Sequence, residues 1–194
     1  MPTPLQKDVE RFTYAHYLTW PAEERWEIID GILYNMSLTP SRYHQEISMN
    51  LAFEINKFLK ENGKNCKVYA APFDVRFPEG EQTDEDITTV VQPDISIVCN
   101  PEKLDDKGCK GAPDFIAEIT SLATIKKDMK DKLILYEKHG VPEYWIIQPE
   151  ENIVMVHKLN EQKKYDRAKI FSKEDVIELK LKEATLEIDL KKIF

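Results

Sequence analysis

The chain has 194 residues, 42% hydrophobic and 32% charged, and its 35 acidic against 27 basic side chains give a formal net charge of -8. This length suits one domain with a sizeable core, and we predict that residues 1–194 form a single domain. The acidic balance argues against a surface that binds nucleic acid over its whole extent, because phosphate binding depends on clustered Lys and Arg. It does not exclude a local basic site.

The sequence shows no membrane span or export signal. No run approaches the roughly 18 consecutive apolar residues that a span requires, and the polar stretch 1–11 lacks the apolar segment of a secretory signal. The cysteines Cys66, Cys99 and Cys109 are odd in number and lack zinc-ligand spacing. We therefore predict a cytoplasmic protein in a reducing compartment, with no membrane partner.

The first strong structural signal is a hairpin. Residues 1–24 are a polar lead-in with a short helical turn. In 26–36, two β-prone runs flank Asp30-Gly31, a dipeptide that favours a type I′ turn. We predict two antiparallel strands joined at this dipeptide.

A helix is predicted next. Thr39 suits its N-cap and Pro40 its first helical position, while Gly63 suits the left-handed residue after its end. Four apolar residues recur at helical spacing: Ile47, Leu51, Ile55 and Phe58. His44 lies on the same stripe, one turn before the first of them.

Three strand-like runs follow, at 67–77, 91–99 and 114–120. An acidic loop at 79–86 separates the first two runs. The segment 100–113, with Pro, Gly and mixed charges, is predicted to be an exposed connection between the last two.

The last part of the chain returns to a helix and then to strands. A second helix is predicted over 125–139, ended by Gly140 and Pro142. The apolar strand 144–148 follows, and 153–159 can pair back on it. The order helix, three strands, helix, strand, with an extra hairpin at each end, predicts an α/β or α+β fold in which helices cover a central mixed sheet.

Two carboxylates are candidate metal ligands. Asp94 begins one predicted strand and Glu118 lies near the end of the next, so antiparallel pairing of these strands would bring both to one sheet edge. Such a pair suits a hard divalent cation such as Mg²⁺. The alternative is that Asp94 caps a turn and Glu118 is solvated. Against this, a lone charge in the apolar run around Glu118 is costly unless it is paired.

The second helix offers a lysine beside these carboxylates. Its predicted core face is Ile125, Met129, Leu133 and Tyr136. Lys132 lies on or beside that face, and Asp128 can pair with it across one turn. Lys132 could instead extend its ammonium group to solvent. Lys126 and Lys127 are rivals that we expect to be solvated.

Two further features have competing interpretations. Asp74 is a carboxylate that could approach the site, or it could pair with Arg76 or Lys67 on the same strand. Tyr144 and Trp145 are expected to pack in the core, with a platform for nucleic-acid bases as the less favoured alternative.

An ordered series of motifs resembles the Uma2 family, a bacterial branch of the PD-(D/E)XK nuclease superfamily. The resemblance covers roughly residues 20–160. The matching segments are Glu27-Ile-Ile-Asp-Gly, Pro40-Ser-Arg-Tyr-His-Gln, Val91-Gln-Pro-Asp-Ile, Ala112-Pro-Asp-Phe-Ile-Ala-Glu-Ile, Lys127-Asp-Met-Lys-Asp-Lys and Tyr136 through Ile146. The superfamily core is also helix, three strands, helix, strand, so the resemblance implies a restriction-endonuclease-like core.

The resemblance implies metal-dependent cleavage of nucleic-acid phosphodiester bonds. Asp94, Glu118 and the carbonyl group of Ile119 would hold Mg²⁺, for which Mn²⁺ can substitute. The superfamily places its catalytic Lys two residues after the Glu, but Thr120 occupies that position here. We therefore predict a displaced catalytic lysine, Lys132 first and Lys126 second.

The resemblance also implies two accessory residues. Glu27 would orient a second metal, through water, or the catalytic lysine. His44 would contact the phosphate or tune a carboxylate, although a histidine on an apolar stripe is more often a core residue.

The implied partner is nucleic acid, taken to be double-stranded DNA, and by analogy the protein would be a homodimer. Residues 74–114 hold eleven acidic and four basic side chains, a net of -7, so most of the charge imbalance is local. The competing hypotheses are a catalytically inactive nuclease-fold binding or regulatory module, suggested by Thr120, and a hydrolase of smaller phosphoesters.

Overall fold

The structure is a computed structural model that describes residues 11–21, 24–36, 40–182 and 184–194. Its helices are α1 (Tyr14–Tyr17), α2 (Arg42–Glu61) and α3 (Leu133–His139), with the π-helical turn η2 (Lys127–Lys132) directly before α3 and 3₁₀ turns at Pro101–Lys103 and Leu190–Lys192. Its strands are β1 (Trp26–Ile29), β2 (Ile32–Asn35), β3 (Lys67–Ala70), β4 (Val75–Arg76), β5 (Val90–Val91), β6 (Ile95–Val98), β7 (Leu104–Asp105), β8 (Gly108–Lys110), β9 (Phe115–Ile119), β10 (Glu143–Gln148), β11 (Ile153–Lys158), β12 (Lys169–Ser172), β13 (Val176–Leu181) and β14 (Ala184–Asp189).

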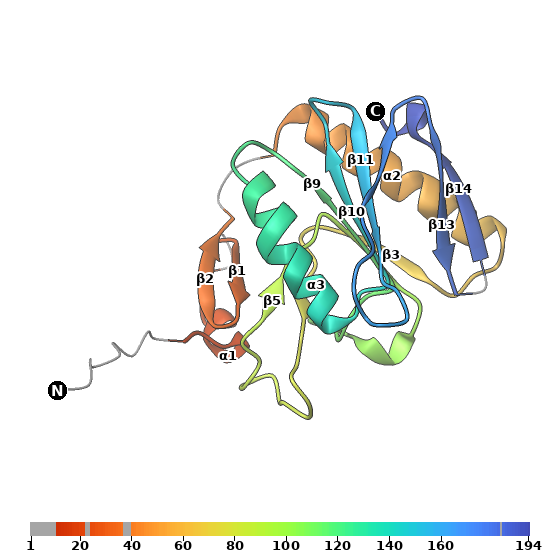
Figure 1. The fold of residues 1–194 in the computed structure, drawn as a ribbon. Coiled ribbons are helices and arrows are strands. Elements are labelled where there is room, and N and C mark those ends of the chain that lie inside the picture. Colours follow the sequence, from red (N-terminus) through yellow and green to blue (C-terminus); the bar gives the residue numbers. More distant parts are fainter. Residues whose placement is uncertain (1–10, 22–23, 37–39, 183) are drawn as a thin grey trace.

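The main sheet has the predicted architecture. Its strand order is β12-β11-β10-β9-β6-β3, and it is mixed because β9 and β10 are parallel while the other neighbours are antiparallel. α3 crosses one side of this sheet, and α2 with the hairpin β13–β14 lies on the other side (Figure 1). Along the chain, α2, β3, β6, β9, α3 and β10 follow the expected order of helix, three strands, helix, strand.

A second sheet, β2-β1-β5-β4-β8-β7, was not predicted. The run 67–77 divides into β3 of the main sheet and β4 of the second, and 91–99 divides in the same way between β5 and β6. Pro93 lies between β5 and β6. Proline has no N–H to donate to a neighbouring strand, so the hydrogen-bonded ladder is interrupted there. The prediction of 100–113 as an exposed connection is wrong in part, since β8 pairs with β4 and Cys109 is buried.

The N-terminal hairpin is confirmed. β1 and β2 pair antiparallel, and the turn residues Asp30 and Gly31 have φ of 49° and 79°. Positive φ at both central positions is the requirement of a type I′ turn, which Asp-Gly meets at little steric cost.

The helix α2 begins later than predicted. Ser41 is its N-cap, and the Ser41 hydroxyl oxygen accepts the backbone N–H of His44 at 3.1 Å. Pro40 therefore precedes the cap, while Thr39 lies outside the described residues. The buried stripe is Ile47, Leu51, Ile55 and Leu59, with Phe58 half-buried beside it.

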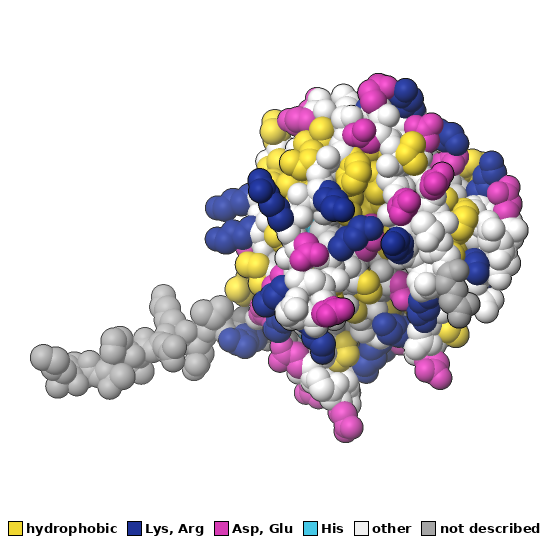
Figure 2. Space-filling view, turned by 45° about the vertical axis from the view of Figure 1, so that its right-hand side comes forward, with side chains coloured by type: hydrophobic (Ala, Val, Ile, Leu, Met, Phe, Trp, Pro, Cys, Tyr) yellow, Lys and Arg dark blue, Asp and Glu magenta, His cyan; other side chains and the backbone are white. Residues whose placement is uncertain are grey.

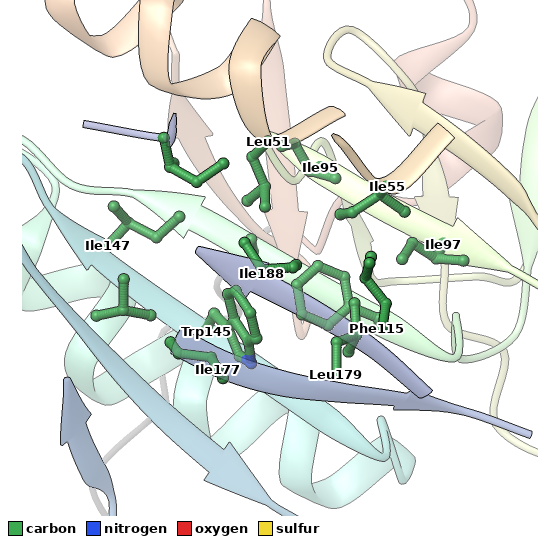
Figure 3. Close-up of a cluster of buried hydrophobic side chains, with 14 of the residues drawn as sticks. Leu51, Ile55, Ile95, Ile97, Phe115, Trp145, Ile147, Ile177, Leu179 and Ile188 are labelled. Carbon is green, nitrogen blue, oxygen red and sulfur yellow. The ribbon is translucent and has the colours of Figure 1, made fainter. Parts of the chain in front are cut away.

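The larger hydrophobic core lies between the main sheet, α2 and the hairpin β13–β14 (Figure 3). Phe115 of β9 and Trp145 of β10 are fully buried there, with ring centroids 5.1 Å apart. Tyr144 is also fully buried, on the α3 side of the sheet. The expectation that Tyr144 and Trp145 pack in the core is confirmed, which excludes them as an open platform for bases.

Two cysteines are bonded to each other. The register of β3 and β6 pairs Lys67 with Val98, so Cys66 faces Cys99, and their sulfur atoms form a disulfide. The prediction that the cysteines are reduced is therefore wrong for Cys66 and Cys99, and Cys109 is the free thiol among the described residues. Among the residues that the structure describes, no helix has the length and apolar character needed to cross a membrane.

Candidate active site

The two candidate metal ligands come from neighbouring strands, as predicted. β6 and β9 pair antiparallel with Ile95 opposite Ala117, which places Asp94 beside the end of β9. One carboxylate oxygen of Asp94 (Oδ2) accepts the backbone N–H of Ile119 at 2.7 Å. By the same register, Asp94 lies directly opposite Glu118 across the pair of strands.

Lys132 reaches the carboxylates. Its ammonium nitrogen lies 2.7 Å from Oε1 of Glu118 and 2.8 Å from Oε1 of Glu27. The hydroxyl group of Tyr136 donates a second hydrogen bond to the same oxygen of Glu118 at 2.7 Å. Lys132 is 1% exposed and Glu27 0%, so these charges pair in the interior, where an unpaired charge would be costly. The predicted inward orientation of Lys132 is confirmed.

The π-helical turn 127–132 produces this orientation. Its hydrogen bonds span five residues rather than four, which shifts the faces of the helix. Asp128 and Lys132 are therefore buried, with 3.9 Å between carboxylate and ammonium, whereas Met129, predicted in the core, is 39% exposed. The hydroxyl group of Tyr144 donates to the backbone carbonyl group of Asp128 at 3.2 Å.

A second lysine, which we expected to be solvated, also binds Glu27. The ammonium group of Lys127 lies 2.8 Å from Oε2 of Glu27, and its side chain is only 15% exposed. The backbone N–H of Gln92 donates to Oε1 of Glu27 at 3.0 Å. The signal for this partner was the burial of Glu27 in a β-strand, because a buried carboxylate requires cations or donors. Lys126 is exposed, and no ion pair joins it to the described carboxylates of the site.

His44 lies beside Asp94. Its Nε2 atom is 3.2 Å from Oδ2 of Asp94, and its side chain is 16% exposed. Burial disfavours the imidazolium form, but the hydrogen bond and charge of Asp94 outweigh burial and raise the pKa of His44 above its usual value. The other ring nitrogen, Nδ1, is buried without a hydrogen-bond partner among the described residues. His44 is therefore placed to act on Asp94, one of its two predicted roles.

Negative charge exceeds positive charge in the site. Glu27, Asp94, Glu118 and Asp128 surround Lys132 and Lys127. Burial, followed by the charges of Asp128, Asp94 and Glu27, raises the pKa of Glu118 despite the opposing effect of Lys132. Such a surplus favours binding of a further cation.

The available donors suit a cation that keeps its own water. Asp94, Glu118 and the carbonyl group of Ile119 are hard oxygen ligands, and Mg²⁺ commonly binds one or two carboxylates together with several waters. No cluster of three or more His, Cys, Asp or Glu side chains able to hold a metal occurs among the described residues. The donors that the site does offer are carboxylate and carbonyl oxygens, the type that hard divalent cations bind.

Thr120 has a structural position. Its hydroxyl group and its backbone N–H both donate to the carbonyl group of Ile147 on β10, at 3.2 Å and 2.8 Å. Its side chain thus points into the sheet, and a lysine there would disrupt the contact between β9 and β10. The ammonium group beside Glu118 is supplied instead by Lys132 of the helical segment 127–132.

Asp74 does not pair with Arg76 or Lys67. Three side chains donate hydrogen bonds to its carboxylate: Tyr14 at 3.1 Å, Tyr17 at 3.0 Å and Gln92 at 2.9 Å. Arg76 instead pairs with Asp84 at 3.2 Å and Asp105 at 2.6 Å. Gln92 links Asp74 to the site: its side-chain amide donates to Asp74, and its backbone N–H donates to Glu27.

The chain is similar to known proteins in sequence and in fold. The model of the Uma2 family, described as "Putative restriction endonuclease", matches residues 14–191. The fold is similar to the crystal structure of a putative nuclease belonging to DUF820 from Anabaena variabilis ATCC 29413, with a TM-score of 0.72 and 19% sequence identity, covering 94% of this chain and 97% of that chain. No curated protein matches the chain.

The fold and the family model place the protein among the restriction-endonuclease-like proteins. The family model spans most of the chain, and the protein belongs to the Uma2 family.

Proposed function

We propose that this protein is an endonuclease that hydrolyses DNA phosphodiester bonds with the help of Mg²⁺, or of Mn²⁺ in its place. The observation that carries the proposal is the buried contact of Lys132 with Glu118 and Glu27. It supplies the ammonium group missing at position 120, next to a carboxylate pair of the type that binds a hard cation.

Asp94, Glu118 and the carbonyl group of Ile119 would hold the metal. When bound, the ion supplies a water of lowered pKa and neutralises phosphate charge. Lys132 orients that water and offsets the charge that develops on the phosphate oxygens. Glu27 keeps Lys132 and Lys127 in place.

His44 contributes at the other carboxylate. Its contact with Asp94 holds that side chain against the end of β9, and its raised pKa favours a cationic ring near the phosphate. The cation would then help to bind the anionic substrate.

Nicking of supercoiled plasmid DNA tests the proposal. We expect nicking with Mg²⁺ and none with EDTA. Glu118→Gln and Lys132→Met should each slow nicking by about 100-fold or more, because each removes a group that acts in the transition state. The matched control is Lys130→Met, which alters an exposed lysine of the same helical segment and should retain the wild-type rate.

Stability measurements keep this test interpretable. Glu118→Gln removes one negative charge from a site that has a surplus, so its unfolding free energy should stay within about 1 kcal/mol of wild type. A purified Glu118→Gln protein that nicks at the wild-type rate would refute the assignment.

The inactive binding module is the alternative outcome, supported by Thr120 and by the occupation of Glu118 Oε1 by two donors. Titration calorimetry separates the two. A nuclease should bind Mn²⁺ and lose that binding in Asp94→Asn, whereas a protein that neither binds Mn²⁺ nor nicks DNA is the inactive module.

We further propose a homodimer, since cutting both strands of DNA needs two active sites. A cytoplasmic location is proposed on the DNA substrate alone, because the disulfide between Cys66 and Cys99 removes the support that the cysteines gave. Sedimentation of the full chain with and without DNA would test the dimer, and a monomer in both conditions would contradict it.

A further inference from the structure

A cleft of about 500 Å³ adjoins the proposed active site. It is formed by α1, the segment after β3, the residues between β5 and β6 and the turn between β7 and β8. The residues that matter to its chemistry are Tyr17, Tyr69, Phe73, Asp74, Gln92 and Asp106. None of them belongs to the carboxylate–lysine cluster.

Two aromatic rings form one wall of the cleft. Tyr69 and Phe73 are stacked, with centroids 4.1 Å apart and planes inclined by 3°. Both side chains are only half-buried. A flat aromatic group can extend such a stack from its open side, and nucleobases stack on protein aromatics whatever their sequence.

The polar part of the cleft is acidic. Asp74 accepts three hydrogen bonds, from Tyr14, Tyr17 and Gln92, whereas a carboxylate can accept about four. No described Lys or Arg forms an ion pair with Asp74, and the cleft residue Lys107 is paired with Asp84 at 2.9 Å.

Asp106 adds a further exposed negative charge. A phosphate group is therefore disfavoured in the cleft. The amino group of a base, which donates hydrogen bonds, suits the free acceptor position of Asp74.

The cleft is joined to the active site by the backbone. Gln92 is two residues from Asp94, and its N–H donates to Glu27. The backbone N–H of Ala71, just before the segment with Phe73 and Asp74, donates to the carbonyl group of Asp94 at 3.0 Å. A nucleotide next to a phosphate at Asp94 would thus lie close to the cleft.

We propose that this cleft binds an unpaired nucleobase adjacent to the scissile phosphate, with the ring stacked on Tyr69 and Phe73 and an amino group at Asp74. A base within a duplex must first leave its stack, which costs free energy, so the cleft favours a strand in which this nucleotide is already unpaired or displaced. Figure 2 shows Lys and Arg mixed with Asp and Glu across one face of the protein. The proposal deepens the nuclease function and rests on it for the role of the bound strand.

The first experiment measures binding without cleavage. Fluorescein-labelled oligonucleotides are titrated with the full chain in EDTA, and anisotropy is recorded for oligo-dC, for the same strand with abasic sites, and for a duplex. We expect oligo-dC to bind about tenfold more tightly than the abasic strand, from the loss of stacking. Oligo-dT, which lacks an amino group, should bind more weakly than oligo-dC.

Variants locate the base. Phe73→Leu should abolish the preference for oligo-dC over the abasic strand, and Phe73→Tyr, which keeps the ring, should restore it. The control Phe53→Leu alters an aromatic residue that is 61% exposed on α2 and should behave as wild type. Equal affinity of the wild type for the two strands, or an unchanged preference in Phe73→Leu, would overturn the base site.

Cleavage is then measured on a duplex with a short unpaired loop and on a fully paired duplex. We expect faster cleavage at the loop, and in Phe73→Leu a higher KM there with kcat within twofold of wild type. If the base preference in binding is present but nothing is cleaved, the nuclease function fails and the base site stands. If both duplexes are cleaved equally and binding shows no base preference, the base site fails and the nuclease function stands.

Discussion

The two faces of the main sheet differ in the kind of residue that they bury. Along β9, Phe115, Ala117 and Ile119 face α2 and the hairpin β13–β14, where they join the larger apolar cluster. Ile116 of the same strand joins the cluster on the α3 side, and Glu118 bonds Lys132 on that side. One strand of five residues therefore contributes to the larger hydrophobic core and to a buried charged site.

The difference separates stability from chemistry. Apolar burial on the α2 side stabilises the fold without electrostatic cost. On the α3 side, Glu27, Glu118 and Lys132 lose hydration and recover it only through one another, so their net contribution to stability is small or unfavourable. A protein that carries such a cluster needs the apolar face to compensate for it.

Truncation of the apolar face should give the largest loss of stability. Phe115→Ala removes a fully buried ring that contacts Trp145, and we expect the free energy of unfolding in urea to fall by about 3–5 kcal/mol. Phe53→Ala, on the exposed side of α2, should change it by less than about 0.5 kcal/mol. A small effect of Phe115→Ala would mean that the core of Figure 3 is not the main source of stability.

The buried ion pairs of Glu27 on the α3 side should make the unfolding free energy depend on pH. Burial opposes ionisation of Glu27, but Lys132 and Lys127 outweigh it and lower its pKa from 4.5 to about 2. Because the folded-state pKa is depressed, the contribution of Glu27 is complete above about pH 4.5 and is lost as pH falls towards 2, with a total of about 3 kcal/mol. Chemical denaturation of wild type and Glu27→Gln should therefore differ most at neutral pH. A difference that stays constant down to pH 2.5 would contradict this ion-pair arrangement.

A smaller loss of stability is expected at Thr120, whose hydroxyl group bonds β10 at the end of β9. Thr120→Val removes the hydroxyl group that donates to Ile147 and keeps the shape of the side chain. We expect a loss of about 1 kcal/mol in unfolding free energy and a nicking rate within twofold of wild type. A large loss of nicking with normal stability would show that Thr120 takes part in the chemistry, contrary to its place in the sheet.

Prediction from the sequence succeeded where local chemistry decides the structure. The turn at Asp30-Gly31 follows from the φ values that these residues tolerate, and the second helix spans 125–139 as predicted, π turn included. The proximity of Asp94 and Glu118 needed only the second and third predicted strand runs to pair, and these runs do pair as β6 and β9, although β7 and β8 lie between them in the chain.

It failed where residues distant in the chain compete for partners. The predicted strand runs 67–77 and 91–99 each divide between the two sheets. No local sequence pattern shows which strand each half of a run will pair with. The odd number of cysteines did not predict the disulfide between Cys66 and Cys99, because their pairing depends on the register of β3 with β6.

The sequence by itself determined the family, the order of the core elements, and the carboxylate and lysine residues that are candidates for the site. The tertiary structure decided which lysines reach the carboxylates: a π turn rotates Lys132 inward, and Glu27, 100 residues before Lys127, is buried where both ammonium groups can contact it. The physical reason is that backbone preferences act over a few residues, whereas a buried charge is satisfied by whichever opposite charge the packing brings near it.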